Sequence, residues 1–570
     1  MTDDKKIIFV FCYKYYFYPY IFLHRLLGYK ILFWQRKNKK KSELLDFLDS
    51  SQFYPLQKSM RKSLNDYFKI HIKSKYNDEI LIDYIIKTTA LSSLSSYDYQ
   101  DYYFFMKLIE NKYGNVKNSK IIASNYLKNI YFNKPPKNNF FYTIGYIFEI
   151  IFSLIKIGKC IIQCIKSYIF YNLDDVPDII YIRKKISPDT HSYSFLSEYF
   201  SRKNVEFNGI YPTFSWKQSK HSIKFINGFE SSASNAIISL LKLLRYFKKD
   251  FIFLVNNGLH PKLVYLYITQ SYYSIYLSEL GAKILYGVLS EDAVNTLLYR
   301  YKQEYQKINS MLDGCIFPPA SAYDYCYHDT FYTTNKLELS TVNLNGGFIA
   351  NSFDVGFLRG GIKANSSGIS NDLLEKIKEY SGTIVIPLAS VSNEKYYIYN
   401  SHDLVRFIEE ILLVTKRNRD KLFVIKGKKG ELKFLTKKQK DVMSRCDNIY
   451  VVKSDTPRTL KYNQFEDLLE YASLVISMTF HSTTVWQTLW KKIPVIACND
   501  IHENSFLKKY KNLEVKFTEL NKVIDYWINI SKKDFNKFLC MLNNEVMFLN
   551  KNPYKIIADD LYSTYCEKYS

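Results

Sequence analysis

The sequence lacks the short motifs that identify many nucleotide-binding and metal-binding proteins. It contains no GxGxxG fingerprint and no Walker A loop, so neither a dinucleotide fingerprint nor a P-loop is indicated. Its nine cysteines show no paired spacing, which argues for a reducing compartment, and Cys160 and Cys164 have no second pair or histidine to complete a zinc site. Asp174-Asp175 is not an Asp-x-Asp metal motif. We therefore expect no metal and no cofactor.

Acidic residues are too few to balance the basic ones. The chain has 55 Asp and Glu against 79 Lys and Arg, a formal net charge of +24. The basic residues are spread along the chain, with only short clusters such as 36–41, and no nucleic-acid-binding module is present. We expect no nucleic-acid partner, although binding on charge alone is an alternative. The charge suits an anionic donor and peripheral contact with an anionic membrane, and general solubility is the simpler explanation.

An uninterrupted apolar run long enough to cross a bilayer is also lacking near the N-terminus. Lys14 and Pro19 interrupt the apolar residues 7–23, which favours a strand followed by a helix over a membrane span. The opening MTDDKK is not followed by a small-residue cleavage site, so no secretory signal is indicated. We expect a cytoplasmic protein, with any membrane contact at the inner face of the cytoplasmic membrane.

The chain has 570 residues, of which 47% are hydrophobic, and this is too long for one hydrophobic core. After a mostly helical N-terminal region, strand and helix patterns alternate in two series, which is typical of parallel sheets covered by helices. The predicted fold class is α/β, with two Rossmann-like domains facing a cleft. The expected divisions are 1–175 (helical), 176–365 (first, acceptor-side domain) and 366–570 (second, donor-binding domain with C-terminal helices).

The individual elements follow from apolar periodicity. Residues 42–132 predict several amphipathic helices. The first alternating series predicts strands at 178–183, 205–211, 251–255 and 282–287, and helices at 193–203, 231–247, 261–280 and 291–303. The second series predicts strands at 383–387, 422–426 and 449–453, and helices at 402–416 and 437–446.

The segment 138–173 predicts one long amphipathic helix. Glu149, Lys156 and Lys159 fall on a narrow polar stripe, and the opposite face is apolar, with Ile151 and Leu154 among its members. Such a helix either lies on a membrane surface or packs its apolar face inside the protein. Burial is the favoured interpretation, because large domains contain many packing helices.

The stretch 467–500 contains the strongest functional signal. A helix end, the apolar run 474–476, a polar segment, a second helix and the apolar run 495–497 predict a βαβ unit. In doubly wound sheets, ligands bind beyond the carboxyl ends of the strands. Ser482, Thr483 and Thr484 offer hydroxyls and backbone N–H groups at a helix start, which favours a phosphate-bearing ligand over helix capping alone. His481 beside them adds a donor or, when charged, a cation.

This stretch also carries a resemblance to a known group. The sequence LVISMTFHSTT, followed by a helix and IPVIA, is similar to the C-terminal half of bacterial surface-polysaccharide enzymes of the GT-B glycosyltransferase architecture. More narrowly, it resembles surface-carbohydrate biosynthesis proteins named for a PFTS motif. Thr479 stands here where that motif has Pro, and His481 where it has its first Thr. Polysaccharide pyruvyl transferases carry a His near this point. The resemblance to the surface-polysaccharide group covers residues 382–500.

Further polar residues follow predicted strands. Lys426 ends the strand LFVIK and suits a diphosphate or sugar phosphate, as the similar IKPK of the resembling group implies, although a basic turn is an equal alternative. Asn499 and Asp500 follow the strand VIAC and suit a ribose or sugar hydroxyl, although Asp500 could equally cap a helix. His260, in the loop after the predicted strand 251–255, is a candidate base for an acceptor hydroxyl, with Asp189, His191 and Glu230 as alternatives.

Together these residues predict a glycosyltransferase-like enzyme of bacterial surface-polysaccharide (lipopolysaccharide or capsule) biosynthesis. It would transfer a sugar from a nucleotide-activated donor to a glycan or lipid-linked acceptor. One alternative is a pyruvyl transferase that uses phosphoenolpyruvate around His481. Another is a non-catalytic assembly protein with an empty cleft.

Overall fold

The structure is a computed structural model of the chain. It describes residues 7–10, 26–27, 30–33, 53–72, 78–91, 99–114, 121–123, 125–135, 140–171, 178–182, 191–212, 223–225, 233–257, 260–287, 294–311, 325–334, 339, 342, 346–358, 368–389, 401–427, 431–452, 464–479, 483–500, 506–510, 512–546 and 552–567.

The N-terminal part combines a small sheet with helices. Three parallel strands lie in the order β2-β1-β3, namely β1 (Ile7–Val10), β2 (Lys30–Phe33) and β3 (Ile121–Ile122). The several helices expected in 42–132 are confirmed as α2 (Phe53–His71), α3 (Glu79–Leu91), α4 (Tyr99–Tyr113) and α5 (Asn125–Tyr131). The helix expected after β1 lies mostly outside the described residues. Among the described helices, none combines the length and apolar content needed to cross a bilayer.

The first large sheet has seven strands in the order β10-β9-β8-β7-β4-β5-β6, parallel except for the β5–β6 pair. Gly287 allows two of its strands to approach closely, because a Cβ there would lie 2.2 Å from the carbonyl oxygen of Ile182. The strands are β4 (Ile179–Ile182), β5 (Phe207–Pro212), β6 (Ile223–Phe225), β7 (Ile284–Gly287), β8 (Lys307–Met311), β9 (Cys326–Thr333) and β10 (Gly347–Asp354).

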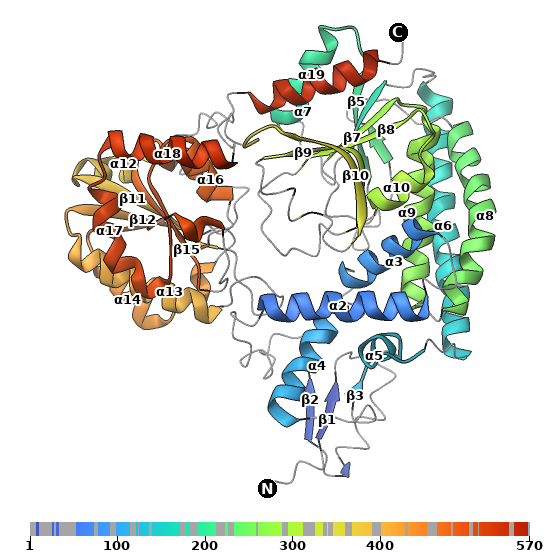
Figure 1. Cartoon of the computed structure of the whole chain (residues 1–570), viewed down its shortest axis with the longest axis horizontal. Coiled ribbons are helices and arrows are strands. Elements are labelled where there is room, and N and C mark those ends of the chain that lie inside the picture. The colour runs from blue at the N-terminus through green and yellow to red at the C-terminus, as the bar shows by residue number, and fades with distance from the viewer. Residues whose placement is uncertain are drawn as a thin grey trace.

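Five helices accompany this sheet: α6 (Phe140–Tyr171), α7 (His191–Ser201), α8 (Ala233–Asn256), α9 (Pro261–Glu279) and α10 (Val294–Tyr301). The predicted strand 251–255 is wrong, because these residues continue α8. Helix α9 is buried along most of its length, and α6 and α8 lie outside it, side by side at the edge of the molecule (Figure 1). We call the seven-stranded sheet with helices α2 to α10 the first lobe.

The long helix expected at 138–173 is confirmed as α6, but the favoured burial of its apolar face is wrong. Ile151, Leu154 and other large apolar side chains of α6 are exposed. Two members of its polar stripe face inward instead: Glu149 is buried, and Lys156 donates a hydrogen bond to the Tyr265 hydroxyl of α9, whereas Lys159 is exposed. The physical reason is that α9 offers polar side chains to the helices that cover it.

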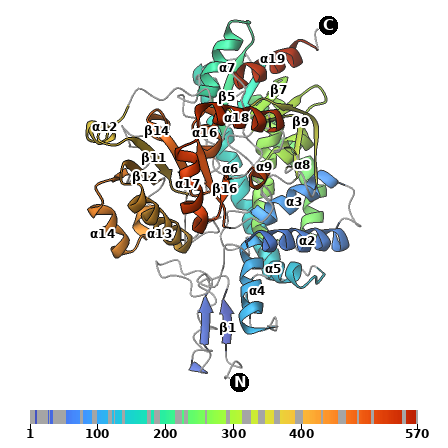
Figure 2. The ribbon, with the colours of Figure 1, turned by 60° about the vertical axis from the view of Figure 1, so that its left-hand side comes forward.

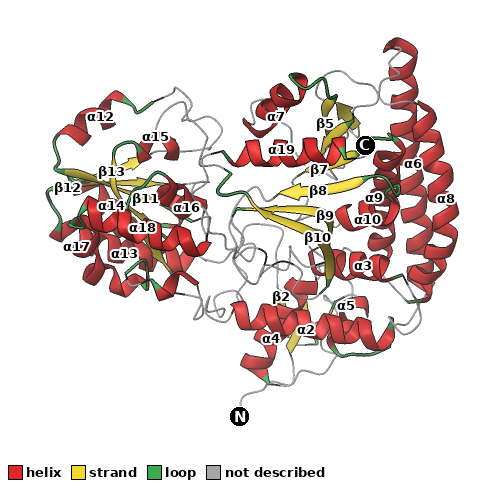
Figure 3. Cartoon of the chain, turned by 45° about the horizontal axis from the view of Figure 1, so that its top comes forward, coloured by secondary structure: helices red, strands yellow, loops and turns green. Residues whose placement is uncertain are grey.

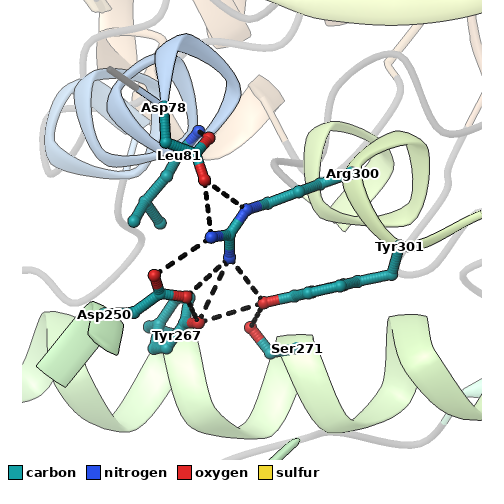
Figure 4. A network of polar contacts seen from close by, with 7 residues as sticks. All are labelled: Asp78, Leu81, Asp250, Tyr267, Ser271, Arg300 and Tyr301. Carbon is teal, nitrogen blue, oxygen red and sulfur yellow. Dashed lines mark hydrogen bonds and ion pairs between the residues drawn. The ribbon is translucent and has the colours of Figure 1, made fainter. Parts of the chain in front are cut away.

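Within the first lobe, a largely buried polar network joins α3 to helices α8, α9 and α10 (Figure 4). The Arg300 guanidinium donates to Asp78 Oδ2 at 2.6 Å, at the start of α3, and to Asp250 Oδ2 of α8 at 2.7 Å. It also donates to the Tyr301 hydroxyl at 2.7 Å, and Tyr267 of α9 donates to Asp250. One guanidinium therefore joins the start of α3 to three later helices, α8, α9 and α10, that lie far from it in sequence.

The second large sheet has six parallel strands in the order β13-β12-β11-β14-β15-β16. They are β11 (Gly382–Pro387), β12 (Lys421–Lys426), β13 (Ile449–Val452), β14 (Ala472–Ser477), β15 (Val495–Cys498) and β16 (Glu514–Val515). The strands predicted between 383 and 497 are confirmed, since every one matches a member of this sheet. This sheet and its helices form the second lobe, which lies beside the first (Figure 2).

The helices of the second lobe are α12 (Asn371–Lys378), α13 (Ser401–Arg417), α14 (Lys437–Arg445), α15 (Phe465–Leu469), α16 (Thr483–Trp490), α17 (Leu520–Ile528) and α18 (Lys532–Val546). Short 3-10 turns lie at Glu431–Phe434, Phe506–Lys509 and Phe517–Glu519. The helices predicted at 402–416 and 437–446 are thus confirmed as α13 and α14.

The last helix, α19 (Pro553–Cys566), returns to the first lobe and packs beside α7 (Figure 3). Ile557, Ala558 and Leu561 share a core with Ile179 and Tyr181 of β4. The predicted fold class, α/β with two parallel-sheet domains, is confirmed. The divisions at residues 175 and 365 stay predictions.

Candidate functional site

The candidate site lies at the carboxyl edge of the second sheet, where parallel strands all end on the same side. Strand register pairs Pro387 with Lys426 and Ser477 with Ala497. The β11–β14 register pairs Val385 with Val475, and its continuation by two residues brings these two strand-end pairs level across the sheet. Lys426 and Ser477 are separated by two strand spacings, about 10 Å. Residues from distant parts of the sequence are thereby brought to one edge, as the βαβ pattern predicted.

Lys426 is a partly desolvated cation at this edge. Its side chain is half-buried at the end of β12. Burial lowers the pKa of its ammonium group, and the carboxylates of Glu466 and Asp467 oppose that shift. Glu466 also accepts a hydrogen bond from Gln487 of α16 at 3.1 Å, which links α15 to α16. An ammonium group with reduced hydration attracts a phosphoryl oxygen more strongly than one in bulk water.

Helix α16 begins with the two predicted threonines. Thr483 and Thr484 are half-buried in its first turn, and the Thr484 hydroxyl lies 3.5 Å from the Ser477 hydroxyl at the end of β14. Ser477 donates to the Thr479 carbonyl at 2.8 Å, which folds the chain back as it leaves the strand. The start of α16 is therefore held over the end of β14. Threonine hydroxyls and the N–H groups of the first helical turn lie there as hydrogen-bond donors. His481 and Ser482 lie outside the described residues.

Asn499 and Asp500 follow β15 at the same edge, and both already make contacts within the protein. Asn499 is buried and donates to Glu514 at 2.6 Å. Asp500 accepts from the Phe517 N–H at 2.8 Å and forms an ion pair with Arg406 at 2.9 Å. These contacts tie Asp500 to the start of the 3-10 turn at Phe517 and to α13, and the capping alternative stays open. Contact with a sugar hydroxyl stays a prediction for both residues.

His260 is buried at the connection between α8 and α9, immediately before Pro261. The strand that was expected to end near it is part of α8, so His260 follows a helix and not a strand end. Helix α6 comes close to this connection, since a Cβ on Gly145 would lie 2.8 Å from Pro261. The structure thus places His260 among the helices of the first lobe, and its role as a base stays a prediction.

The analysis of strand ends alone did not single out Arg406 and Ser477. Arg406 lies on α13, and only its contact with Asp500 brings it to the edge. Ser477 was noted as part of the polar segment, but a buried serine at a strand end gives no separate signal in sequence. With Lys426 and the threonines of α16, the edge presents a cation and hydroxyl donors, which is the chemistry that binds an anion, whereas Arg406 is paired with Asp500. Within the described ranges, no group of three or more His, Cys, Asp or Glu side chains is placed to hold a metal ion.

Comparison with known protein families and with curated proteins gives no match. Among solved structures, the chain is similar to S. aureus MnaA with UDP, at 10% identity, 66% and 92% coverage of the two chains and a TM-score of 0.40. The trehalose-phosphate synthase of Burkholderia vietnamiensis gives 8% identity, 70% and 100% coverage and 0.41. The wall teichoic acid polymerase TagF gives 11%, 75% and 99%, and 0.33. At this level of similarity, these likenesses add nothing to the two-sheet architecture already evident from the chain's own strands.

Proposed function

We propose that the chain is a glycosyltransferase-like enzyme of bacterial surface-polysaccharide biosynthesis, related to the PFTS-motif group. It transfers a sugar from a nucleotide-activated donor to a glycan or lipid-linked acceptor. The observation that supports this most is the level alignment of Lys426 with the end of β14, over which the start of α16 is held. A cation and a helix N-terminus about two strand spacings apart suit the separate phosphoryl groups of a nucleotide diphosphate.

In this proposal the second lobe stabilises the leaving group. Charge develops on the leaving phosphate as the sugar departs, and fixed N–H dipoles of α16 and the Lys426 ammonium group lie ready to stabilise it. Ser482, Thr483 and Thr484 supply hydroxyl donors, and Asn499 and Asp500 are the proposed contacts for ribose or sugar hydroxyls. His481 and His260 are the two candidate bases for the acceptor hydroxyl, and each is tested by replacement with Gln.

The proposed place of action is the cytoplasm, at the inner face of the cytoplasmic membrane. The net charge of +24 supports contact with a surface of opposite charge, where a lipid-linked acceptor would be found. A second α/β lobe beside the first also allows the two to enclose the donor and exclude water from it.

The test is ligand-induced stabilisation of the purified protein by nucleotide sugars, CMP-linked acids included, and by phosphoenolpyruvate. A bound donor at about 100 times its Kd should raise the free energy of unfolding by about 3 kcal/mol. Lys426→Met should weaken that donor about ten-fold to a hundred-fold, through loss of a charge-assisted hydrogen bond. Thr483→Val with Thr484→Val should raise KM or lower kcat.

Matched controls come from the opposite edge of the same lobe. Lys421→Met removes a lysine from the other end of β12, and donor affinity should change less than about two-fold. Thr415→Val removes a hydroxyl that donates only within α13. Equal losses of donor affinity in Lys426→Met and Lys421→Met would show that the carboxyl edge is not the donor site. Stabilisation by phosphoenolpyruvate alone would replace the proposal with the pyruvyl transferase, and no stabilisation by any of these ligands would favour a non-catalytic assembly protein.

A further inference from the structure

The outward surfaces of α6 and α8 concentrate most of the exposed large apolar side chains of the described chain. Fourteen of 25 such side chains lie on these two helices. On α8, Ile238, Leu241 and Leu244 recur every three residues, and Ile237 and Ile252 fall on the same stripe, whereas Tyr246 lies towards Tyr301 of α10. We call the side chains on these stripes the outer apolar face: Ile144, Ile147, Phe148, Ile151, Phe152, Leu154, Ile155 and Ile162 on α6, with Ile237, Ile238, Leu241, Leu244 and Ile252 on α8.

The two helices lie side by side, so their stripes form one surface and not two separate ones. Both pack on α9, and both lie on the side of the first lobe away from the second lobe (Figures 1 and 3). Solvent-facing helices ordinarily carry charged and polar residues on this side. Monomeric soluble proteins rarely expose a continuous apolar patch of more than a few hundred Å², and larger ones mark interaction sites.

The charges around the outer apolar face are of one sign. In the described parts of α6 and α8, the exposed charged side chains are all basic: Lys159, Arg245, Lys248 and Lys249. The two acidic residues on the same helices, Glu149 and Asp250, are buried on the inward side. Lys242 lies at the border and forms an ion pair with Glu279 of α9. The surface therefore combines apolar contact with positive charge.

We infer that the outer apolar face docks on an anionic lipid bilayer, with α6 and α8 lying in the plane of its surface. Apolar residues with interspersed basic ones are the composition of interfacial helices, which insert about 5–10 Å into the headgroup region. A second copy of the chain is a poorer occupant. In a two-fold symmetric dimer the same surface meets itself, which would bring basic side chains together, and the described parts of α6 and α8 expose no acidic side chain to pair with them.

This inference specifies the surface for the membrane location proposed above, but it does not depend on the transferase chemistry. The carboxyl edge of the second sheet belongs to the other lobe. Docking through α6 and α8 therefore leaves that edge free to bind its donor.

The experiment is co-sedimentation of the full chain with phosphatidylcholine vesicles, with and without phosphatidylglycerol. The wild-type chain should bind the vesicles that contain phosphatidylglycerol, and added salt should weaken the binding. Ile151→Gln with Leu241→Gln should weaken partitioning by on the order of a hundred-fold, because two apolar side chains no longer leave water. Lys248→Gln with Lys249→Gln should weaken it about thirty-fold.

Two control variants make the same chemical changes on the second lobe. Leu413→Gln with Met541→Gln replaces two exposed apolar side chains, and Lys532→Gln with Lys533→Gln removes two exposed adjacent lysines. Both controls should bind vesicles as the wild type does. All variants replace exposed residues, so circular dichroism should show an unchanged fold.

Several results would overturn the inference. These are no binding by the wild type, equal binding to phosphatidylcholine alone, or equal losses in the second-lobe controls. A wild-type dimer in lipid-free buffer that Ile151→Gln with Leu241→Gln converts to a monomer would show that a second copy occupies the face. Donor-induced stabilisation is measured without lipid, so the failure of either proposal is distinguishable from failure of the other.

Discussion

Helices α8 and α13 are both long outer helices of an α/β lobe, and they turn opposite sides to solvent. On α13, Phe407 and Ile411 are buried in the core of the second lobe, while Glu409 and Arg417 are exposed. On α8 the apolar Leu241 is 61% exposed, whereas the charged Asp250 is only 1% exposed. Both helices have a clear apolar stripe, so amphipathicity alone does not determine which side is buried.

The difference lies in what each helix covers. Helix α13 packs on a sheet whose buried strands are almost entirely apolar. Helices α6 and α8 pack on α9, which presents Tyr265 and Tyr267 as well as apolar side chains. Burial raises the pKa of Tyr265 to about 12, so its hydroxyl stays neutral and accepts the Lys156 hydrogen bond. A polar partner underneath allows an outer helix to bury polar residues and leave apolar ones outside.

Removing Arg300 from the polar network of the first lobe should have the largest effect on the free energy of unfolding. Arg300→Ala leaves the carboxylate of Asp250 buried without its guanidinium, which should cost about 3–5 kcal/mol of unfolding free energy. Arg202→Ala breaks an exposed pair with Glu198 and should cost less than about 1 kcal/mol. Denaturant unfolding of both variants measures the difference, and similar costs would contradict a structural role for the network.

Two leucines on α8 test which side of the helix faces inward. Leu243 is 1% exposed and Leu241 is 61% exposed, although they lie two residues apart. Leu243→Ala should therefore cost about 2–5 kcal/mol, as for a cavity in a packed core. Leu241→Ala should change stability by less than about 0.5 kcal/mol in lipid-free buffer. If thermal or denaturant unfolding gave the reverse order, α8 would be turned the other way and the contrast with α13 would disappear.

His328 should make stability depend on pH. It is fully buried in β9, and neither ring nitrogen has a hydrogen-bond partner within the described structure. Burial, and then the charge of Lys87, lower its pKa to about 3, below its ordinary value near 6.5. The unfolded chain therefore binds the proton more tightly, and stability falls as pH drops from about 6.5 towards 3, by about 3 kcal/mol at about pH 4.5.

Replacement of His328 isolates this contribution. His328→Phe keeps a ring stacked on Phe331 but removes the titrating group, so unfolding midpoints measured between pH 7 and 4.5 should change less than in the wild type. His402→Phe, at an exposed position on α13, should keep the wild-type dependence. An unchanged slope in His328→Phe would mean that other groups account for acid sensitivity.

The second lobe was predicted almost completely from sequence, and the first lobe only in part. Strands such as 422–426 are short apolar runs between helical patterns, so their periodicity changes clearly. In the first lobe, residues 251–255 are also a short apolar run, but they extend the stripe of α8 and were mistaken for a strand. Strand β9 was missed because His328, Asp329 and Thr330 give it a polar composition although it is buried.

The candidate site was predictable where it follows from strand ends. Lys426 and the threonines of α16 lie at the carboxyl edge because parallel strands place their ends together. The partners of Asp500 were not predictable, since Arg406 and Phe517 reach it from separate elements. The exposure of the α6 apolar side likewise depends on tertiary contacts with α9, which no local pattern reports.

The return of α19 to the first lobe has a consequence for biosynthesis. Domains generally fold in order as the ribosome releases them, the N-terminal one first. Here Leu561 fills the same core as Tyr181, some 380 positions earlier in the chain. The core that Tyr181 shares with α19 therefore stays open until α19 has been made, and until then the nascent chain exposes apolar surface there to which a chaperone could bind.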